Sequence, residues 1–197
     1  MEDMKSNNYK KALLVIDIQE DYTGTTAKPP FPYKDSARLI TTVNKLIEEA
    51  SKKDILILYI RQEFDSFSGK AFSKLVGHGT AIKGRPGTEF DKRINIVSCH
   101  SFTKPMPDAF TNPELEVFLK EHEVKELYLV GLDAAGCVYF TAKGALKRGY
   151  GVSIIKEGIV LLAEEKWNRL LEKFELEGIK PITSQEFSEN GDPESNY

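Results

Sequence analysis

The chain has 197 residues, the length of one ordinary domain, and can bury about two-thirds of the surface that the unfolded chain exposes. Its 27 Lys and Arg and 30 Asp and Glu leave a net charge of −3, so the charge favours neither nucleic acid nor an anionic membrane surface as a partner. Two cysteines are too few for a disulfide framework or a four-thiolate metal site, and no apolar run is long enough for a signal peptide or a membrane span. These features predict a cytoplasmic protein.

Short apolar, β-branched runs dominate the chain between its two ends. They lack the polar and apolar alternation of a strand with one wet face, which is typical of a parallel sheet covered on both sides. The runs that we expect to be strands are 12–18, 55–60, 94–97, 127–132, 152–155 and, more weakly, 181–183. The polar ends, residues 1–9 and 188–197, are expected to be flexible tails on one domain of residues 10–187.

Segments with helical spacing separate these runs. We expect a helix capped by Asp35 and further helices over 113–121, 136–147 and 163–176. The alternation of strand and helix predicts right-handed crossovers and a doubly wound, three-layer α/β/α sandwich. Residues 62–92 depart from this pattern, and loops of that length are usually functional covers. We therefore expect them, with a short helix near 70–75, to form the wall of a pocket.

Asp17 is the first candidate for chemistry. It lies inside the apolar sequence LLVIDIQ, between Ile16 and Ile18, near the end of the first predicted strand. Ligands of doubly wound sheets bind outside the carboxyl ends of the strands, and an acid in an apolar strand needs a partner. Asp17 is therefore a catalytic candidate, and the alternative is an acid that caps the next turn.

Cys137 follows the fourth predicted strand in the sequence VGLDAAGCVYFTAKGALKRGY. The small residues Ala134, Ala135 and Gly136 before it let the backbone approach a ligand closely. We expect the thiol at or near a helix N-terminus, where unpaired amides and the helix dipole lower the pKa of a thiol. The same amides can hold an oxyanion. The alternative is a small core residue, as most free cysteines are.

Lys104, in SFTKPMPDAF, follows the third predicted strand, and Pro105 favours an extended backbone there. A single lysine is most often a surface charge. Its position changes that expectation, because Asp17, Lys104 and Cys137 follow the first, third and fourth strands. A switch in strand order would bring all three to one crevice.

The remaining thiol and the histidines form no comparable pattern. Cys99 and His100 are adjacent, and neighbours in an extended segment point in opposite directions, which disfavours a thiolate–imidazole pair. His78, His100 and His122 lack metal-ligand spacing, and the glycines of GHGTAIKGRPG do not match a phosphate-binding loop. The sequence therefore predicts no metal and no cofactor.

Three segments together carry a resemblance that covers nearly the whole chain: VIDIQEDY, SFTKPMPDAF and VGLDAAGCVYFTAKGALKRGYGVSII. In them the chain resembles the isochorismatase-like cysteine hydrolase superfamily, which includes nicotinamidases, N-carbamoylsarcosine amidases and ureidoacrylate amidohydrolases. The resemblance implies a six-stranded, mainly parallel, Rossmann-like sheet and a catalytic triad of Asp17, Lys104 and Cys137. It also implies a cis peptide before Asp133, whose amide would join that of Cys137 in an oxyanion hole, and a homodimer or homotetramer.

At three places the chain differs from members of this superfamily, and these differences narrow the range of expected substrates. Isochorismatases proper lack the cysteine, so Cys137 favours cleavage of a C–N bond. The metal-binding Asp-x-His and further His of nicotinamidases are replaced by YIRQEFDSF, which disfavours nicotinamide and a bound metal. Ureidoacrylate-type enzymes carry Thr-Asn or Thr-Asp where this chain has Ala135-Gly136.

The predicted function is a cysteine hydrolase that cleaves the amide or carbamoyl C–N bond of a small molecule through a thioester on Cys137. Gln19, Tyr22 and Phe64 are the candidate substrate-binding residues, although all three could be packing residues. A catalytically inert binding or interaction protein of the same fold is the alternative function. A redox thiol protein is disfavoured because no resolving cysteine lies near Cys137 in the sequence.

Overall fold

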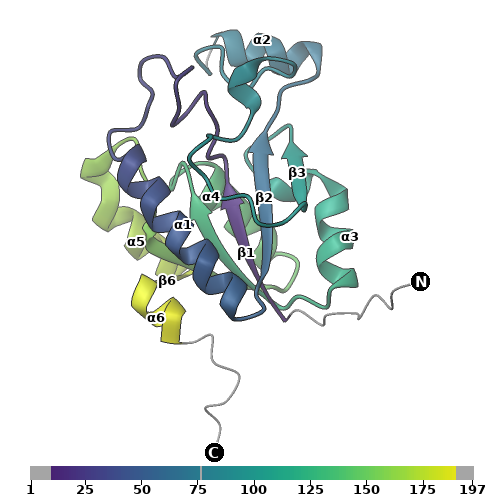
Figure 1. Ribbon diagram of the computed structural model, residues 1–197, viewed down its shortest axis with the longest axis vertical. Helices are drawn as coiled ribbons and strands as arrows, with labels where there is room; N and C mark the ends of the chain where they lie inside the picture. Colours follow the sequence, from purple (N-terminus) through teal and green to yellow (C-terminus); the bar gives the residue numbers. More distant parts are fainter. Residues whose placement is uncertain (1–9, 76, 190–197) are drawn as a thin grey trace, which may run out of the picture.

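The computed structural model describes residues 10–75 and 77–189, and within them six strands form one sheet between two layers of helices (Figure 1). All strand pairs are parallel, in the order β3-β2-β1-β4-β5-β6. The strands are β1 (Lys11–Ile16), β2 (Leu56–Gln62), β3 (Ser101–Lys104), β4 (Glu126–Gly131), β5 (Gly151–Ile159) and β6 (Lys180–Ile182). The predicted three-layer α/β/α fold with a parallel sheet is confirmed.

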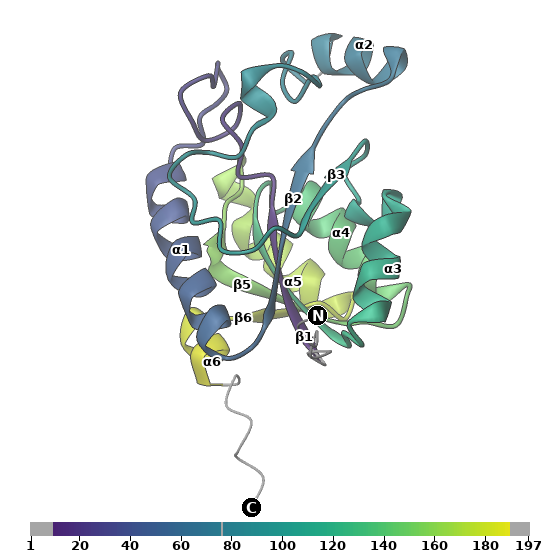
Figure 2. The same cartoon turned by 45° about the vertical axis from the view of Figure 1, so that its right-hand side comes forward.

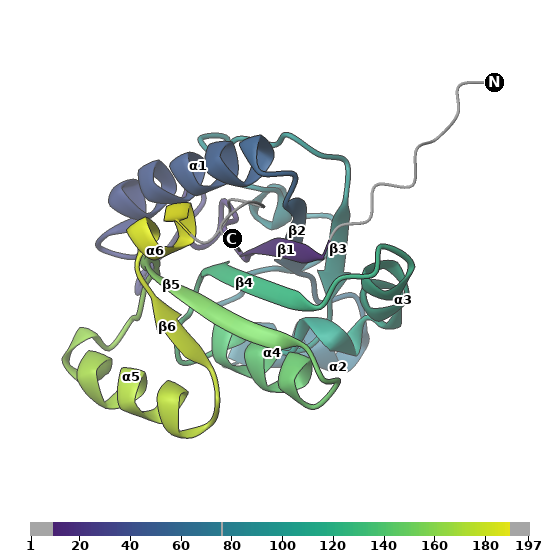
Figure 3. The same cartoon turned by 90° about the horizontal axis from the view of Figure 1, so that it is seen from below.

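Helices cover both faces of the sheet. Seen from below, α1 and α6 lie on one face, and α3, α4 and α5 lie on the other (Figure 3). The bounds are α1 (Ser36–Lys52), α2 (Phe67–Leu75), α3 (Pro113–Glu121), α4 (Cys137–Leu146), α5 (Trp167–Leu176) and α6 (Ser184–Glu189), with short 3-10 turns η1 (Pro86–Thr88), η2 (Ala109–Thr111) and η3 (Glu164–Lys166). Each face of β1 packs into a separate apolar core, with Leu13 and Val15 toward α1 and Leu14 and Ile16 toward α4.

The predicted strand over 94–97 is wrong. The third strand is β3, which pairs with β2 from Tyr59 opposite Ser101 to Gln62 opposite Lys104. Side chains already satisfy the backbone of the apolar run, because the Tyr59 hydroxyl donates to the Asn95 carbonyl at 2.7 Å and accepts from the Val97 amide at 3.1 Å. The run therefore needs no strand partner, and Lys104 is the last residue of the third strand instead of following it.

Most helix predictions are confirmed, but the first and the last of the four predicted helices begin differently from what the sequence predicted. Asn112 caps α3 by accepting from the Glu114 amide at 3.0 Å. Asp35 precedes α1, but its carboxylate makes no capping bond and pairs with Arg38 instead, at 3.2 Å. The helix predicted over 163–176 divides into η3 and α5.

The segment between β2 and β3 carries the expected short helix, α2, which lies beyond the carboxyl ends of the strands (Figure 1, Figure 2). At the other end of the chain, α6 extends to Glu189, two residues past the predicted end of the domain at 187. The rest of both predicted tails, residues 1–9 and 190–197, lies outside the described residues. None of the described helices is long and apolar enough to cross a membrane.

Candidate active site

The strand order reverses between β1 and β4, because β2 and β3 continue the sheet on one side and β5 and β6 on the other. This switch point is where a doubly wound sheet opens a crevice at its carboxyl edge. Asp17 directly follows β1, and the backbone at the end of β4 approaches it closely. Gly131, with a φ of +117°, makes this approach possible, since a Cβ there would collide with the Ile16 carbonyl.

Asp17, Lys104 and Cys137 meet at this edge. The Lys104 ammonium lies 2.9 Å from Oδ2 of Asp17 and 3.1 Å from the Cys137 sulfur. Lys104 is 0% exposed and Asp17 is 2% exposed, so the ion pair is shielded from solvent. The structure therefore brings together the three residues that the sequence placed after separate strands.

Burial and neighbouring groups have opposite effects on the pKa of Lys104. Burial alone would lower the pKa of Lys104, but the Asp17 charge and the hydrogen bonds to Asp17 and Cys137 outweigh it and the pKa is raised. The ammonium therefore stays charged at neutral pH. The other oxygen of Asp17, Oδ1, is buried and has no hydrogen-bond partner among the described residues. This oxygen is a free acceptor, on a carboxylate that lies close enough to the Cys137 thiol to raise the pKa of that thiol.

The expected lowering of the Cys137 pKa is wrong. Cys137 is the first residue of α4, as the sequence suggested, but burial raises the pKa of its thiol to about 12, with a further contribution from the Asp17 charge. Lys104 offsets only part of this increase. Desolvation acts on the whole thiolate charge, whereas a helix N-terminus contributes only a partial charge. The resting group is a neutral thiol, and its activation requires a base.

The loop between β4 and α4 presents two unused amides. The Leu132–Asp133 peptide is cis. Among the backbone hydrogen bonds of the described residues, none is donated by the N–H of Asp133 or of Cys137. The Asp133 carboxylate is held by the Leu162 amide at 2.7 Å and the Ala135 amide at 2.8 Å. The loop is thus anchored while both predicted oxyanion-hole donors remain free.

The thiol lines a cavity of about 590 Å³. Tyr22 and Phe64 both line it, in agreement with their predicted place in the pocket wall. The segment 62–92 supplies much of the rest, including Phe72 of α2. The prediction that this segment walls a pocket is confirmed.

The match to a known family agrees with this geometry. The model of the isochorismatase domain matches residues 11–186. The chain belongs to the isochorismatase family. An uncharacterized family member of Bacillus subtilis, YddQ, is 28% identical over 156 residues, covering 74% of this chain and 75% of the relative.

Two other relatives are informative. The nicotinamidase of Escherichia coli is 25% identical over 181 residues, covering 75% of this chain and 82% of that enzyme. The crystal structure of an isochorismatase-like hydrolase from Alkaliphilus metalliredigens superposes with a TM-score of 0.80 at 24% identity, covering 93% of this chain and 99% of the other. The latter likeness concerns the fold.

Gln19 is not part of the cavity wall in this isochorismatase-family chain. It is completely buried, and its side-chain amide is fully used. Its oxygen accepts from the Gln62 amide at 2.8 Å, and its nitrogen donates to the carbonyls of Gln62 at 3.1 Å and Thr88 at 2.9 Å. Gln19 therefore joins the end of β1 to the covering segment, and we assign it a structural position.

Gln62 is the residue that sequence reasoning missed. It is the last residue of β2 and lines the cavity beside Cys137. Its amide oxygen accepts from the Lys104 ammonium at 2.6 Å, and its amide nitrogen donates to the Lys104 carbonyl at 3.0 Å. A polar residue closing the apolar strand LILYIRQ at the carboxyl edge of the sheet is the signal that could have found it.

A buried polar cluster holds the covering segment in place. Asp91 is 2% exposed and accepts from the Thr23 hydroxyl at 2.8 Å and from the Arg93 guanidinium at 2.7 Å. Burial raises the pKa of Asp91, but the bonds from Arg93 and Thr23 outweigh burial and the pKa is lowered. The segment thus has a charged anchor near its end.

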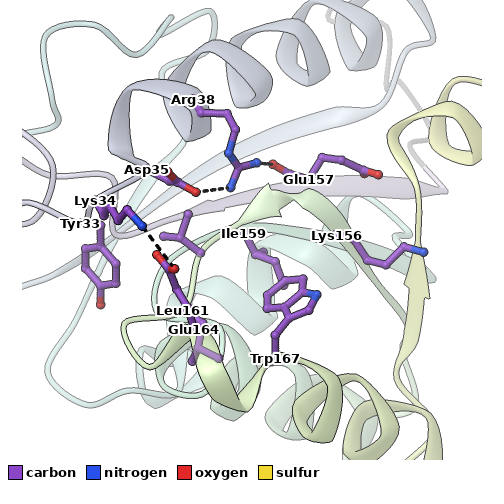
Figure 4. A pocket seen from close by; sticks show the side chains of 11 residues that line it. Tyr33, Lys34, Asp35, Arg38, Lys156, Glu157, Ile159, Leu161, Glu164 and Trp167 are labelled. Atoms are coloured by element: carbon purple, nitrogen blue, oxygen red, sulfur yellow. Dashed lines mark hydrogen bonds and ion pairs between the residues drawn. The ribbon is translucent and has the colours of Figure 1, made fainter.

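A second pocket, of about 520 Å³, opens between the start of α1, the end of β5 and the start of α5 (Figure 4). Four of its charged side chains form ion pairs, Lys34 with Glu164 at 3.7 Å and Arg38 with Asp35 at 3.2 Å. Trp167 forms part of its lining. No Cys, Ser, Thr or His is among its described lining residues, so the Cys137 cavity is the candidate active site.

The other residues weighed from the sequence lie apart from the triad, except His78, which lines the Cys137 cavity. Cys99 is exposed and lines no part of that cavity. The rings of His100 and His122 both pack on Phe118. Among the described residues, no three His, Cys, Asp or Glu side chains are grouped so as to hold a metal ion.

Proposed function

We propose that this chain hydrolyses the C–N bond of a small amide or carbamoyl compound, with Cys137 as the nucleophile and a thioester as the intermediate. The contact that carries the proposal is the Lys104 ammonium lying within hydrogen-bond distance of both the Asp17 carboxylate, at 2.9 Å, and the Cys137 sulfur, at 3.1 Å. A thiol, a base and a fixed cation at the wall of one cavity are the groups that acyl transfer requires.

In the first step, Asp17 takes the thiol proton and the sulfur attacks the carbonyl carbon. The thiol is neutral at rest, so proton removal and attack are coupled, and the free oxygen Oδ1 is the acceptor. The carbonyl π electrons move onto oxygen, and the amides of Asp133 and Cys137 hold the resulting oxyanion. One such donor is typically worth about 100-fold to 1,000-fold in rate.

Collapse of the tetrahedral intermediate breaks the C–N bond. The electron pair leaves with nitrogen, which takes the proton held by Asp17 and departs as ammonia or an amine, and the acyl group remains on sulfur. Water then attacks the thioester while Asp17 accepts its proton, the C–S bond breaks and the proton returns to sulfur. The net reaction is amide plus water to carboxylic acid plus amine.

Lys104 positions and stabilises the charged groups of the site. Its raised pKa leaves it positively charged throughout the neutral range. The ammonium orients the Asp17 carboxylate and stabilises the negative charge that develops on sulfur, in surroundings where such contacts are strong because water is excluded. It gives no proton in this scheme and acts through position and charge.

Family membership and one named relative support the proposal. The Escherichia coli relative is a nicotinamidase, an amide hydrolase by name. The cysteine favours C–N cleavage over the isochorismatase reaction, as the sequence predicted. The homodimer or homotetramer, the cytoplasmic location and the absence of a metal stay predictions.

The test is ammonia release from a panel of small amides, ureas and carbamoyl compounds. We expect turnover of at least one compound by the wild type and by the Cys99→Ala control, and none by Cys137→Ala. Full turnover by Cys137→Ala on a confirmed substrate would refute the nucleophile. Binding of panel compounds with no turnover by any form would favour the inert binding protein.

A further inference from the structure

We propose that the acyl group of the substrate is uncharged and apolar, and that the cavity rejects amides carrying a carboxylate. The inference rests on the proposed function, because it assumes that the amide carbonyl is placed at the Cys137 thiol. It concerns the wall of the cavity and not the triad. It therefore stands or falls on separate observations.

Apolar side chains form most of the wall. They come from three different segments of the chain: Phe31, Phe64, Phe72, Pro105, Met106 and Pro107. The other described residues that line the cavity are Cys137 and glycines, residues with neutral hydroxyl or amide groups, and one histidine, and none is Lys, Arg, Asp or Glu. Such a wall suits a hydrocarbon or aromatic acyl group.

The cation that contacts the thiol is not available to a substrate. Lys104 is 0% exposed and does not line the cavity, and its ammonium already contacts Asp17, Gln62 and Cys137. The charges of Lys104 and Asp17 cancel, since the thiol is neutral at rest. A substrate carboxylate would leave water for a largely apolar wall that offers neutral hydrogen-bond donors but no Lys or Arg as a counter-charge, which is unfavourable.

The cavity is also large enough for a long acyl group. Its volume of about 590 Å³ lies within the usual range of small-molecule pockets. Phe72 stands on α2 at its rim and is 53% exposed, so a bound hydrocarbon would cover it. Each buried methylene then improves kcat/KM about fourfold until the cavity is filled.

The first measurement compares two amides of equal carbon number, hexanamide and 6-amino-6-oxohexanoate, at about pH 8, where histidine side chains are generally uncharged. We expect kcat/KM for hexanamide to be at least about 100-fold higher. In the series acetamide, butanamide and hexanamide, kcat/KM should rise about fourfold per methylene. Equal kcat/KM values for hexanamide and 6-amino-6-oxohexanoate, or equal kcat/KM values along the series, would overturn the inference.

A pair of variants on one helix tests the wall itself. Phe72→Arg places a guanidinium at the rim of the cavity and should shift the preference toward 6-amino-6-oxohexanoate by at least about tenfold. Phe67→Arg adds the same charge to α2 at a residue that is 92% exposed and does not line the cavity. Phe67→Arg should leave the ratio unchanged, and an equal shift in both variants would contradict the inference.

Binding separates this inference from the proposed function. In Cys137→Ala, titrations followed by ligand-observed NMR should show hexanamide binding at least about tenfold more tightly than 6-amino-6-oxohexanoate. If this holds while the wild type turns over no amide, the preference of the cavity for an uncharged, apolar group stands and the proposed function fails. If the wild type hydrolyses both amides equally well, the function stands and the inference fails. Failure of Cys137→Ala to bind hexanamide would also overturn the inference.

Discussion

Replacement of Lys104 by methionine removes the cation at the centre of the site while keeping a side chain of similar length. The loss leaves the Asp17 carboxylate, 2% exposed, without its 2.9 Å partner and leaves the Gln62 amide oxygen without its 2.6 Å donor. Breaking a buried ion pair on one side costs about 3–5 kcal/mol. An orphaned buried acceptor adds about 1–3 kcal/mol. We expect Lys104→Met to lose at least about 4 kcal/mol of unfolding free energy, together with all turnover.

The double variant Asp17→Asn with Lys104→Met is the control for this reasoning. Replacing both members of a buried pair leaves no uncompensated charge, so only neutral polar groups, the Gln62 oxygen and the new amide at position 17, have lost their Lys104 contact. The double variant should therefore recover about 3 kcal/mol relative to Lys104→Met. Urea unfolding followed by circular dichroism at neutral pH measures all forms.

The comparison remains decisive if Lys104→Met does not fold. A folded double variant beside an unfolded single variant would support the same explanation. A double variant that is as unstable as Lys104→Met, within about 0.5 kcal/mol, would refute it, because the uncompensated carboxylate would then not be the source of the loss.

Four further predictions follow, of which two concern the thiol, one concerns Gln62 and one concerns Gly131 beside Asp17. Because burial raises the pKa of Cys137 from the ordinary 9.0 to about 12, the folded thiol keeps its proton at pH values where the unfolded one loses it. The unfolding free energy therefore falls as pH rises above 9.0, and it falls by roughly 1 kcal/mol per pH unit more in the wild type than in Cys137→Ala. Urea unfolding midpoints that fall with pH at the same rate in both proteins would contradict this. Iodoacetamide at neutral pH should label the exposed Cys99 before Cys137, as peptide mass spectrometry would show; faster labelling of Cys137 would mean that its pKa is lowered. Gln62→Leu should lower kcat by about tenfold or more through Lys104, and a change confined to KM would instead make Gln62 a substrate contact. Gly131→Ala should lower the unfolding free energy by at least about 3 kcal/mol, because the new Cβ would meet the Ile16 carbonyl. Gly149→Ala, also at positive φ but with nothing near its Cβ, should lower it by about 1 kcal/mol. Similar losses in the two variants would contradict the close approach at Gly131.

The sequence alone predicted the fold class and the three side chains that meet at the carboxyl edge of the sheet. Strands buried on both faces are mostly apolar, so β1, β2, β4 and the first half of β5 can be recognised in the sequence as apolar runs. A charged or reactive residue directly after such a run, as Asp17 is, or at the start of the next helix, as Cys137 is, lies near the carboxyl edge of the sheet. Asp17 and Cys137 could be found for this local reason.

The edge strand could not be found in the same way. β3 carries the sequence SFTK, and only its last residue is buried, so it has no apolar run to mark it. The run at 94–97 looked like a strand by composition, but Tyr59 from β2 bonds its backbone across 36 residues of chain. Which segment pairs with β2 depends on these contacts, and they exist only in the folded molecule.

Tertiary structure also decided the chemistry of the site. A helix N-terminus is a local feature and argues for a lowered thiol pKa, but the burial that raises it comes from residues far apart in the chain. Gln19 and Gln62 are both glutamines near strand ends, yet one joins backbone segments and the other holds Lys104. Position after a strand determined which side chains could meet, and packing determined their protonation states and partners.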